Sequence, residues 1–205
     1  PRSPAPRSAP STDKKVGLKT DAASAVVVRH NLGRISMARA DYAEAVKVFS
    51  EILKVHPERH EVRFDRATCY LEQGNARLAR ADMDVLMAAS PTSLDRKELL
   101  FLRAAISMKE RLYRAAKADL EEVLRLSPEN VSASLLLSIA DEKDGRPQEA
   151  LDRLNVLLQA HPEEVQALVL RADLEAGFGR FEAARVDYDT AIRLAPEQAD
   201  LYVRR

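Results

Sequence analysis

The sequence predicts an all-α fold in which antiparallel helix pairs stack side by side into a solenoid. Three observations support this prediction. Good helix formers (Ala, Leu, Arg and Glu) dominate the 205 residues. Five prolines recur with spacings of 34, 37, 34 and 34 residues. An alanine stands twelve residues before each of these prolines. Self-similarity at a period of roughly 20 to 50 residues is typical of repeat architectures.

Each repeat carries the same landmarks at fixed distances from its proline. A small residue lies 24 positions before the proline, the alanine 12 before it and a large apolar residue 8 before it. In chain order, the prolines are Pro57, Pro91, Pro128, Pro162 and Pro196; the small residues Gly33, Ala67, Ala104, Ser138 and Ala172; the alanines Ala45, Ala79, Ala116, Ala150 and Ala184; the large residues Phe49, Met83, Leu120, Leu154 and Tyr188. Agreement of every landmark in five copies is a stronger signal than any single short motif.

The pattern within one repeat predicts two helices joined by a short turn. Two stretches of about fourteen residues have apolar side chains at helical spacing. Glycine in the intervening turn favours a helix end in the left-handed conformation. Small residues on both helices allow close approach, the large residue fills the space between pairs, and the proline ends the second helix. The predicted turns are residues 40–42, 74–76, 111–113, 145–147 and 179–181.

Residues 1–20 differ in composition from the rest of the chain. Four prolines lie among serines and a threonine, and five basic side chains stand against one acid. This stretch has too little apolar surface to offset its ordering entropy, so we predict a flexible basic leader. A short contact of this leader with an acidic surface is the alternative. The array then spans 22–205, with repeats at about 26–59, 60–93, 97–130, 131–164 and 165–198 and a partial sixth at 199–205.

The 37-residue spacing indicates an insertion of three residues near 91–96. Asp95 followed by Glu98 is typical of a capping box that opens a helix. We therefore expect the insertion to lengthen a connecting loop and to leave the helices intact.

The landmarks resemble those of the tetratricopeptide repeat family, a helix–turn–helix repeat of 34 residues. The first copy matches best, with Leu32, Gly33, Ala45, Phe49 and Pro57, although the family's leading Trp is absent from every copy. The resemblance covers about residues 26–196. It implies a right-handed superhelix that serves as a non-catalytic scaffold for protein–protein interaction.

One pair of positions varies together between the repeats. Arginine precedes the small residue in the second, third and fifth units, and the same units carry an aspartate sixteen residues later. We predict that each pair joins the two helices of its unit; chance in a charge-rich sequence is the alternative. The pairs are Arg66 with Asp82, Arg103 with Asp119, and Arg171 with Asp187.

Charge and residue counts argue against several functional classes. Thirty-two basic and 32 acidic side chains give no net charge, whereas nucleic-acid binders normally have a basic excess. The longest uncharged stretch, 131–140, is half of what a membrane span needs. Cys69 is expected to be a core residue, and the four histidines do not form a ligand set. We therefore predict no catalytic residues, no metal site and no cofactor. The compartment stays open, with a soluble protein of the cytoplasm preferred.

The first helix of each unit is expected to line the concave side of the array. Its remaining side chains are unusually apolar in the middle units, which is typical of a partner site. We predict a groove for a protein partner's peptide or amphipathic helix, lined by His30, Arg34, Phe64, Thr68, Leu71, Phe101, Ala105, Met108, Leu135, Ile139 and Val169.

Three alternatives to this groove stay open. These residues are also suited to pack against other parts of a larger protein, since the pattern restarts at Ala199 and stops at Arg205, which leads us to expect a longer natural chain. Self-association through the uncapped C-terminal end is the second. A co-chaperone clamp for a carboxylate is the third, and it is disfavoured because Asp65 and Glu98 occupy clamp positions and would repel that ligand.

Overall fold

The computed structural model describes residues 22–205, which contain eleven α-helices and no strand. The leader predicted for residues 1–20 lies outside the described residues. The helices are α1 (Ala22–Ala38), α2 (Tyr42–Val55), α3 (His60–Glu72), α4 (Ala76–Ala89), α5 (Arg96–Lys109), α6 (Tyr113–Leu126), α7 (Val131–Lys143), α8 (Pro147–Ala160), α9 (Val165–Gly177), α10 (Phe181–Leu194) and α11 (Ala199–Arg204).

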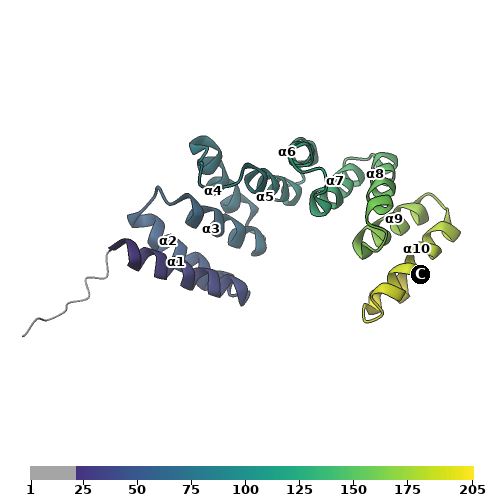
Figure 1. Cartoon of the computed structure of the whole chain (residues 1–205), viewed down its shortest axis with the longest axis horizontal. Coiled ribbons are helices and arrows are strands. Elements are labelled where there is room, and N and C mark those ends of the chain that lie inside the picture. Colours follow the sequence, from purple (N-terminus) through teal and green to yellow (C-terminus); the bar gives the residue numbers. More distant parts are fainter. Residues whose placement is uncertain (1–21) are drawn as a thin grey trace, which may run out of the picture.

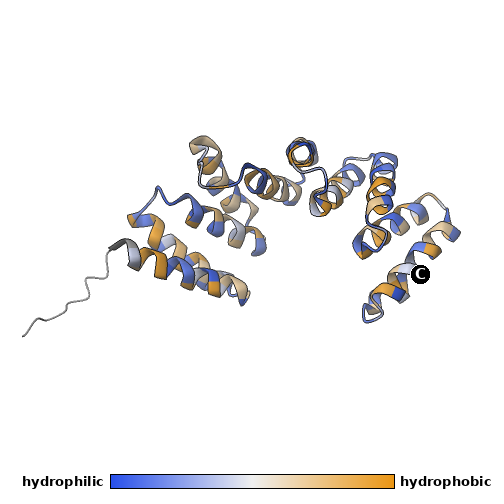
Figure 2. Cartoon of the chain, in the orientation of Figure 1, coloured by the Kyte–Doolittle hydropathy of each residue, from blue (hydrophilic) through white to orange (hydrophobic). Residues whose placement is uncertain are grey.

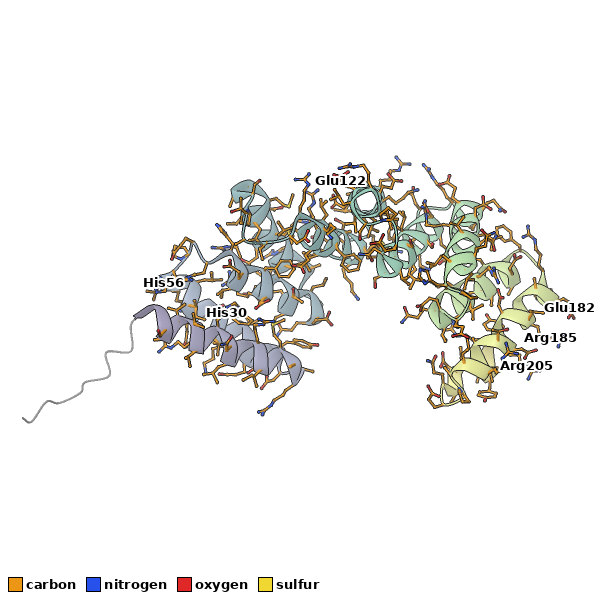
Figure 3. The ribbon with its side chains drawn as sticks, in the orientation of Figure 1. His30, His56, Glu122, Glu182, Arg185 and Arg205 are labelled. Atoms are coloured by element: carbon orange, nitrogen blue, oxygen red, sulfur yellow. The ribbon has the colours of Figure 1, made fainter. Side chains whose placement is uncertain are left out.

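Consecutive helices form pairs, and each pair contacts the next along the chain. Figure 1 shows the pairs following one another along an arch, with α1 and α10 at opposite ends. Hydrophilic and hydrophobic residues are interspersed along the helices (Figure 2), and the second helices of the units are the more amphipathic ones, as expected for helices packed on one face. Helix α6 lies on the convex side of the arch, and its Glu122 is labelled in Figure 3. The prediction of an all-α solenoid of stacked helix pairs is confirmed.

The repeated landmarks form the core of the array. Ala45 and Phe49 of the first unit are fully buried, as are the matching Ala79 and Met83 of the second. The core is shared between units, since Met83 belongs to one apolar cluster with Ile106 of the third unit. Stability therefore depends on contacts between neighbouring units as well as within them.

All five turns between paired helices place one residue at positive φ. Glycine stands there in three units, but Ala40 (φ 59°) and Arg111 (φ 62°) occupy the same place in the other two. In the second unit Asn75 N donates to Tyr70 O (2.8 Å) and Gly74 N to Leu71 O (2.9 Å), which is a Schellman motif. The glycine-based turn prediction thus extends to turns without glycine, because the helix-end hydrogen bonds impose the conformation.

We expect Arg111→Gly to stabilise the protein by about 1 kcal/mol, because a left-handed conformation costs a residue with a Cβ about that much. Urea unfolding followed by circular dichroism measures the change. Ala118→Gly, at an exposed position within α6, is the control and should destabilise by about 0.5–1 kcal/mol. Equal effects of both substitutions would contradict the argument.

The three-residue insertion lies where α4 connects to α5, as predicted, and it lengthens the connection by two residues and the start of α5 by one. This connection, residues 90–95, is longer than the four-residue links between the other pairs. Asp95 is the N-cap of α5, and its Oδ1 accepts a hydrogen bond from Lys97 N (2.8 Å). The insertion therefore changes a loop and leaves both flanking helices continuous.

The predicted Arg–Asp pairs are present in all three units. Arg66 donates from Nε and Nη2 to the two carboxylate oxygens of Asp82, at 2.8 and 2.7 Å. Arg171 and Asp187 form the same two-point contact at 2.7 Å each, and Arg103 pairs with Asp119 in the same way. The three aspartates are buried, so the arginines neutralise charges that lie inside the array.

The fourth unit reverses this charge arrangement. Leu137 and Arg153 replace the arginine and the aspartate of the other units. Arg153 Nε instead lies 3.2 Å from Oδ2 of Asp141, a fully buried residue one turn after Leu137. Lys117 of the preceding unit also pairs with Asp141. In the fourth unit the acid therefore lies on the first helix and the cation on the second. The sequence prediction paired an arginine on the first helix with an aspartate on the second, so it did not identify this ion pair.

Candidate partner-binding groove

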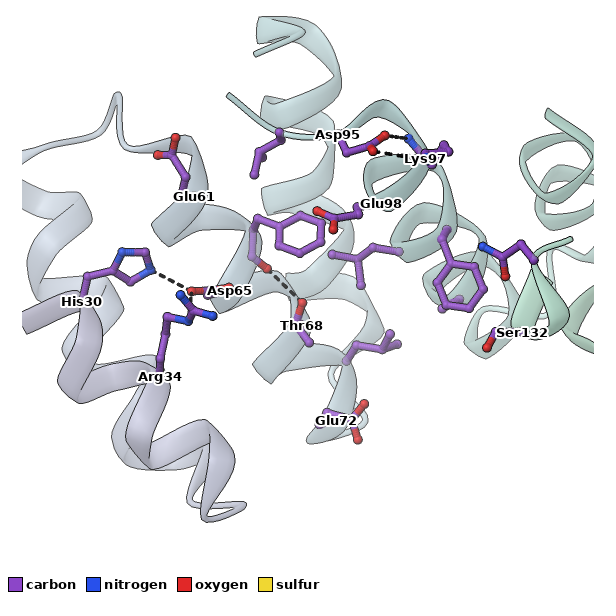
Figure 4. A pocket seen from close by; sticks show the side chains of 17 residues that line it. His30, Arg34, Glu61, Asp65, Thr68, Glu72, Asp95, Lys97, Glu98 and Ser132 are labelled. Atoms are coloured by element: carbon purple, nitrogen blue, oxygen red, sulfur yellow. Dashed lines mark hydrogen bonds and ion pairs between the residues drawn. The ribbon is translucent and has the colours of Figure 1, made fainter. Parts of the chain in front are cut away.

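The first helices of successive units lie beside one another, with α1 next to α3, α3 next to α5 and α5 next to α7. A hollow with a volume of about 910 Å³ crosses this face from α1 to the start of α7. Figure 4 shows it from close by. We call it the groove.

The floor of the groove is apolar. Phe64 and Phe101 are half-buried, and each packs against the core of its unit on one side while it lines the groove on the other. Leu71 and Leu102 lie beneath them and are almost fully buried. Thr68 lies in the middle, and its hydroxyl donates to Phe64 O (3.1 Å). Because that hydroxyl already donates a hydrogen bond within the helix, a ligand on the floor does not have to supply an acceptor for it.

A charged cluster on α1 and α3 forms the N-terminal wall. His30 Nε2 lies 2.7 Å from Asp65 Oδ2, and Arg34 Nε lies 3.9 Å from the same oxygen. The His30 ring also meets Phe49 edge-on, with ring centres 5.7 Å apart. The side chains of His30 and Arg34 are therefore both directed at the carboxylate of Asp65 (Figure 4).

The opposite wall comes partly from the insertion. Leu94 and Asp95 line the groove from the connection between α4 and α5, next to Lys97 at the start of α5. Lys97 Nζ lies 3.6 Å from Asp95 Oδ2. The sequence did not predict these groove residues, although the three-residue insertion marks the place at which the groove departs from a regular array.

Three further carboxylates line the groove: Glu61 and Glu72 on α3, and Glu98 on α5. Within residues 24–205, none of them takes part in an ion pair like those of Asp65 and Asp95. A hydrogen bond from the Ser93 side chain lowers the pKa of Glu61 from its usual value, against the opposing effect of burial. The groove therefore combines an apolar floor with an acidic border.

The structure brings together seven of the eleven predicted groove residues. These are His30, Arg34, Phe64, Thr68, Leu71, Phe101 and Ala105. Of the other four residues, Leu135 is buried in an apolar core cluster and Val169 packs against the same cluster. Met108 packs against the core cluster of the third unit. Ile139 is half-buried and does not line the hollow. Helical spacing alone did not separate groove positions from adjacent core positions in the later units.

A second hollow of about 770 Å³ lies between α6 and α8. Leu124 and Pro128 line it together with Val156, which is 68% exposed. Because it involves second helices, it is separate from the groove and offers a position for control substitutions.

The described residues offer little for chemistry. Cys69 is fully buried, and burial raises the pKa of its thiol to about 12, aided by Asp65 and Glu72. A thiolate nucleophile is therefore scarce at neutral pH. Over the described part of the chain, no three His, Cys, Asp or Glu side chains are grouped so as to hold a metal ion. None of the described helices has the length and apolar character required to span a bilayer.

Comparisons with known protein families identify the same repeat family in both halves of the array. Two family models described as tetratricopeptide repeat match residues 30–93 and 107–174. Together these matches cover more than half of the chain. No curated protein sequence gave a significant match.

Solved structures share the fold. A tetratricopeptide repeat protein from Parabacteroides merdae ATCC 43184 has a TM-score of 0.76 and 25% identity, over 88% of this chain and 69% of that chain. MamA from Desulfovibrio magneticus RS-1 has a TM-score of 0.73 and 17% identity, over 85% and 97%. A thermophilic protein of the same repeat type from Thermus thermophilus has a TM-score of 0.68 and 21% identity, over 87% and 96%.

Proposed function

Since the chain belongs to the tetratricopeptide repeat family, we propose that its groove holds a peptide or an amphipathic helix of a partner protein. Repeats of this family serve as protein-interaction scaffolds, which gives the general role. We propose in addition that the partner binds on the concave face of the first three units.

The observation that carries this proposal is the pair of phenyl rings on the groove floor. Phe64 and Phe101 lie on neighbouring helices, supported from below by the core and open to the groove above. Aromatic residues held rigidly in a hollow are typical anchors of binding energy. A helix with apolar side chains on one face buries them in such a groove.

We also propose that the chain acts without catalysis. The family is generally non-catalytic. Cys69 is shielded from solvent with a raised pKa. It therefore lacks the exposed, activated environment that a nucleophile requires.

The co-chaperone alternative finds less support. A clamp for a carboxylate needs free cations on the groove face, whereas His30 and Arg34 are directed at Asp65. Glu98 adds a negative charge beside the floor, and Leu102 lies buried beneath it. An acidic ligand would meet repulsion here.

Peptide display against the full chain tests the proposed groove. We expect selected peptides to lose binding to a variant that combines Phe64→Glu with Phe101→Glu, because charges would replace the apolar anchors. Circular dichroism and thermal unfolding check that this variant stays folded. Ala105→Gln is a second variant that fills the groove from a half-buried position at the edge of the core, and the same unfolding measurements apply to it.

Val156→Glu, in the second hollow, is the matched control and should keep full binding. Peptides that bind all these variants equally would contradict the groove. Sedimentation at several concentrations tests self-association: a concentration-dependent oligomer that the Phe64 and Phe101 substitutions abolish would mean that the groove binds a second copy.

A further inference from the structure

We propose that the partner segment bound in the groove is basic, with lysines or arginines on both sides of apolar anchor residues. This inference rests on the proposed function of the groove and adds the chemistry of its partner. It follows from the charges that border the floor and from how they are placed.

The groove has more carboxylates than its own cations neutralise. Asp65 is met by His30 and Arg34, and Asp95 is met by Lys97. The three remaining acids, Glu61, Glu72 and Glu98, have no such cation among the residues lining the groove. Elsewhere the chain supplies a cation to each of its buried aspartates: Asp82, Asp119, Asp141 and Asp187. Carboxylates that are not paired with a cation of the groove lining therefore border its apolar floor.

The positions of these acids define where a partner's cations would lie. Glu61 and Glu72 lie at opposite ends of the α3 face, eleven residues apart, which is about 16 Å along a helix. Glu98 lies on α5, beside the floor (Figure 4). The phenyl rings of Phe64 and Phe101 lie within this border. A segment with central apolar anchors and flanking cations matches both features.

Electrostatics turns this arrangement into selectivity. A partner that covers the floor removes water from the nearby carboxylates, which is unfavourable unless the partner brings opposite charges. An acidic partner would add like-charge repulsion at the same time. We therefore expect the border to discriminate by charge, and the floor to supply the affinity common to all apolar anchors.

The first test uses the peptides selected on the groove. We expect enrichment in lysine and arginine beside apolar residues. One selected basic peptide and its twin with glutamate in place of each basic residue are then titrated against the full chain. The basic peptide should bind at least about tenfold more tightly, and added salt should weaken its binding.

Variants of the border locate this preference. Combined Glu61→Gln and Glu98→Gln should reduce the preference for the basic twin by about fivefold or more, with the fold unchanged. Glu121→Gln, at an exposed position on α6 away from the groove, is the matched control and should change nothing. An equal loss in both variants would overturn the assignment to the border.

The outcomes separate the two proposals. Groove-dependent peptides that are neutral or acidic would overturn the basic partner and leave the groove standing. Peptides whose binding is unchanged by the Phe64 and Phe101 substitutions would overturn both the groove and the basic partner. A third result concerns residues 1–20: Lys14, Lys15 and Lys19 flank Val16 and Leu18 there. If replacing the three lysines by glutamine in the full chain raises peptide affinity about tenfold, the leader is the occupant and the partner assignment is wrong. Unchanged affinity supports the partner.

Discussion

Gly33→Ala is expected to destabilise the first unit by about 3 kcal/mol, toward the upper end of what overpacking a core costs. A Cβ atom at Gly33 would lie 2.2 Å from Cε1 of Phe49, far inside van der Waals contact. The Phe49 ring is fully buried, so it has no open space into which to move. Because repeat arrays unfold in parts, amide hydrogen exchange in α1 and α2 is the appropriate measurement.

The other units supply the control for this prediction. The third unit carries Ala104 at the position of Gly33 and the smaller Leu120 at that of Phe49, and both are fully buried. Combining Gly33→Ala with Phe49→Leu should therefore recover a large part of the lost protection. If the double variant is as destabilised as the sum of the single ones, the two positions do not compete for the same space.

Arg103→Ala is expected to cost about 3 kcal/mol, because it leaves the carboxylate of Asp119 inside the array without its cation. The measurement is equilibrium unfolding in urea. Asp119→Ala should cost less, since the Arg103 side chain is about one-third exposed and reaches water more readily.

The first unit provides an uncharged version of this pair. Leu32 and Val48 stand where the third unit has Arg103 and Asp119. The double variant Arg103→Leu with Asp119→Val should lie within about 1 kcal/mol of the wild type, because apolar pairs of similar volume replace buried ion pairs at little cost. Additive losses in the double variant would mean that the two side chains are not coupled.

The periodic part of the fold could be predicted from the sequence because residues of similar size fill the same core positions in every unit. The buried alanines and the large residues, such as Phe49 and Met83, recur at fixed spacing. The covarying arginines and aspartates were found for the same reason. Departures from the repeat were not found: Asp141 in the reversed pair, and the left-handed conformation of Ala40 and Arg111 in the two turns that lack glycine.

The groove was predicted less completely than the fold. Residues on the first helices of the early units, such as Phe64 and Phe101, were identified from their position within the repeat. Leu94 was missed because it comes from the insertion, which the period does not describe. Leu135 was included although it is buried, because its place within the repeat does not show that it packs into an apolar cluster with residues of α8 and α9.

The most direct test of the central claim is to locate a bound peptide on the array. A photo-reactive amino acid in place of Thr68, in the middle of the groove floor, should cross-link efficiently to a peptide selected on the full chain. The same amino acid in place of Val156, in the second hollow, should not. Cross-linking at position 156 without cross-linking at position 68 would show that partners bind elsewhere.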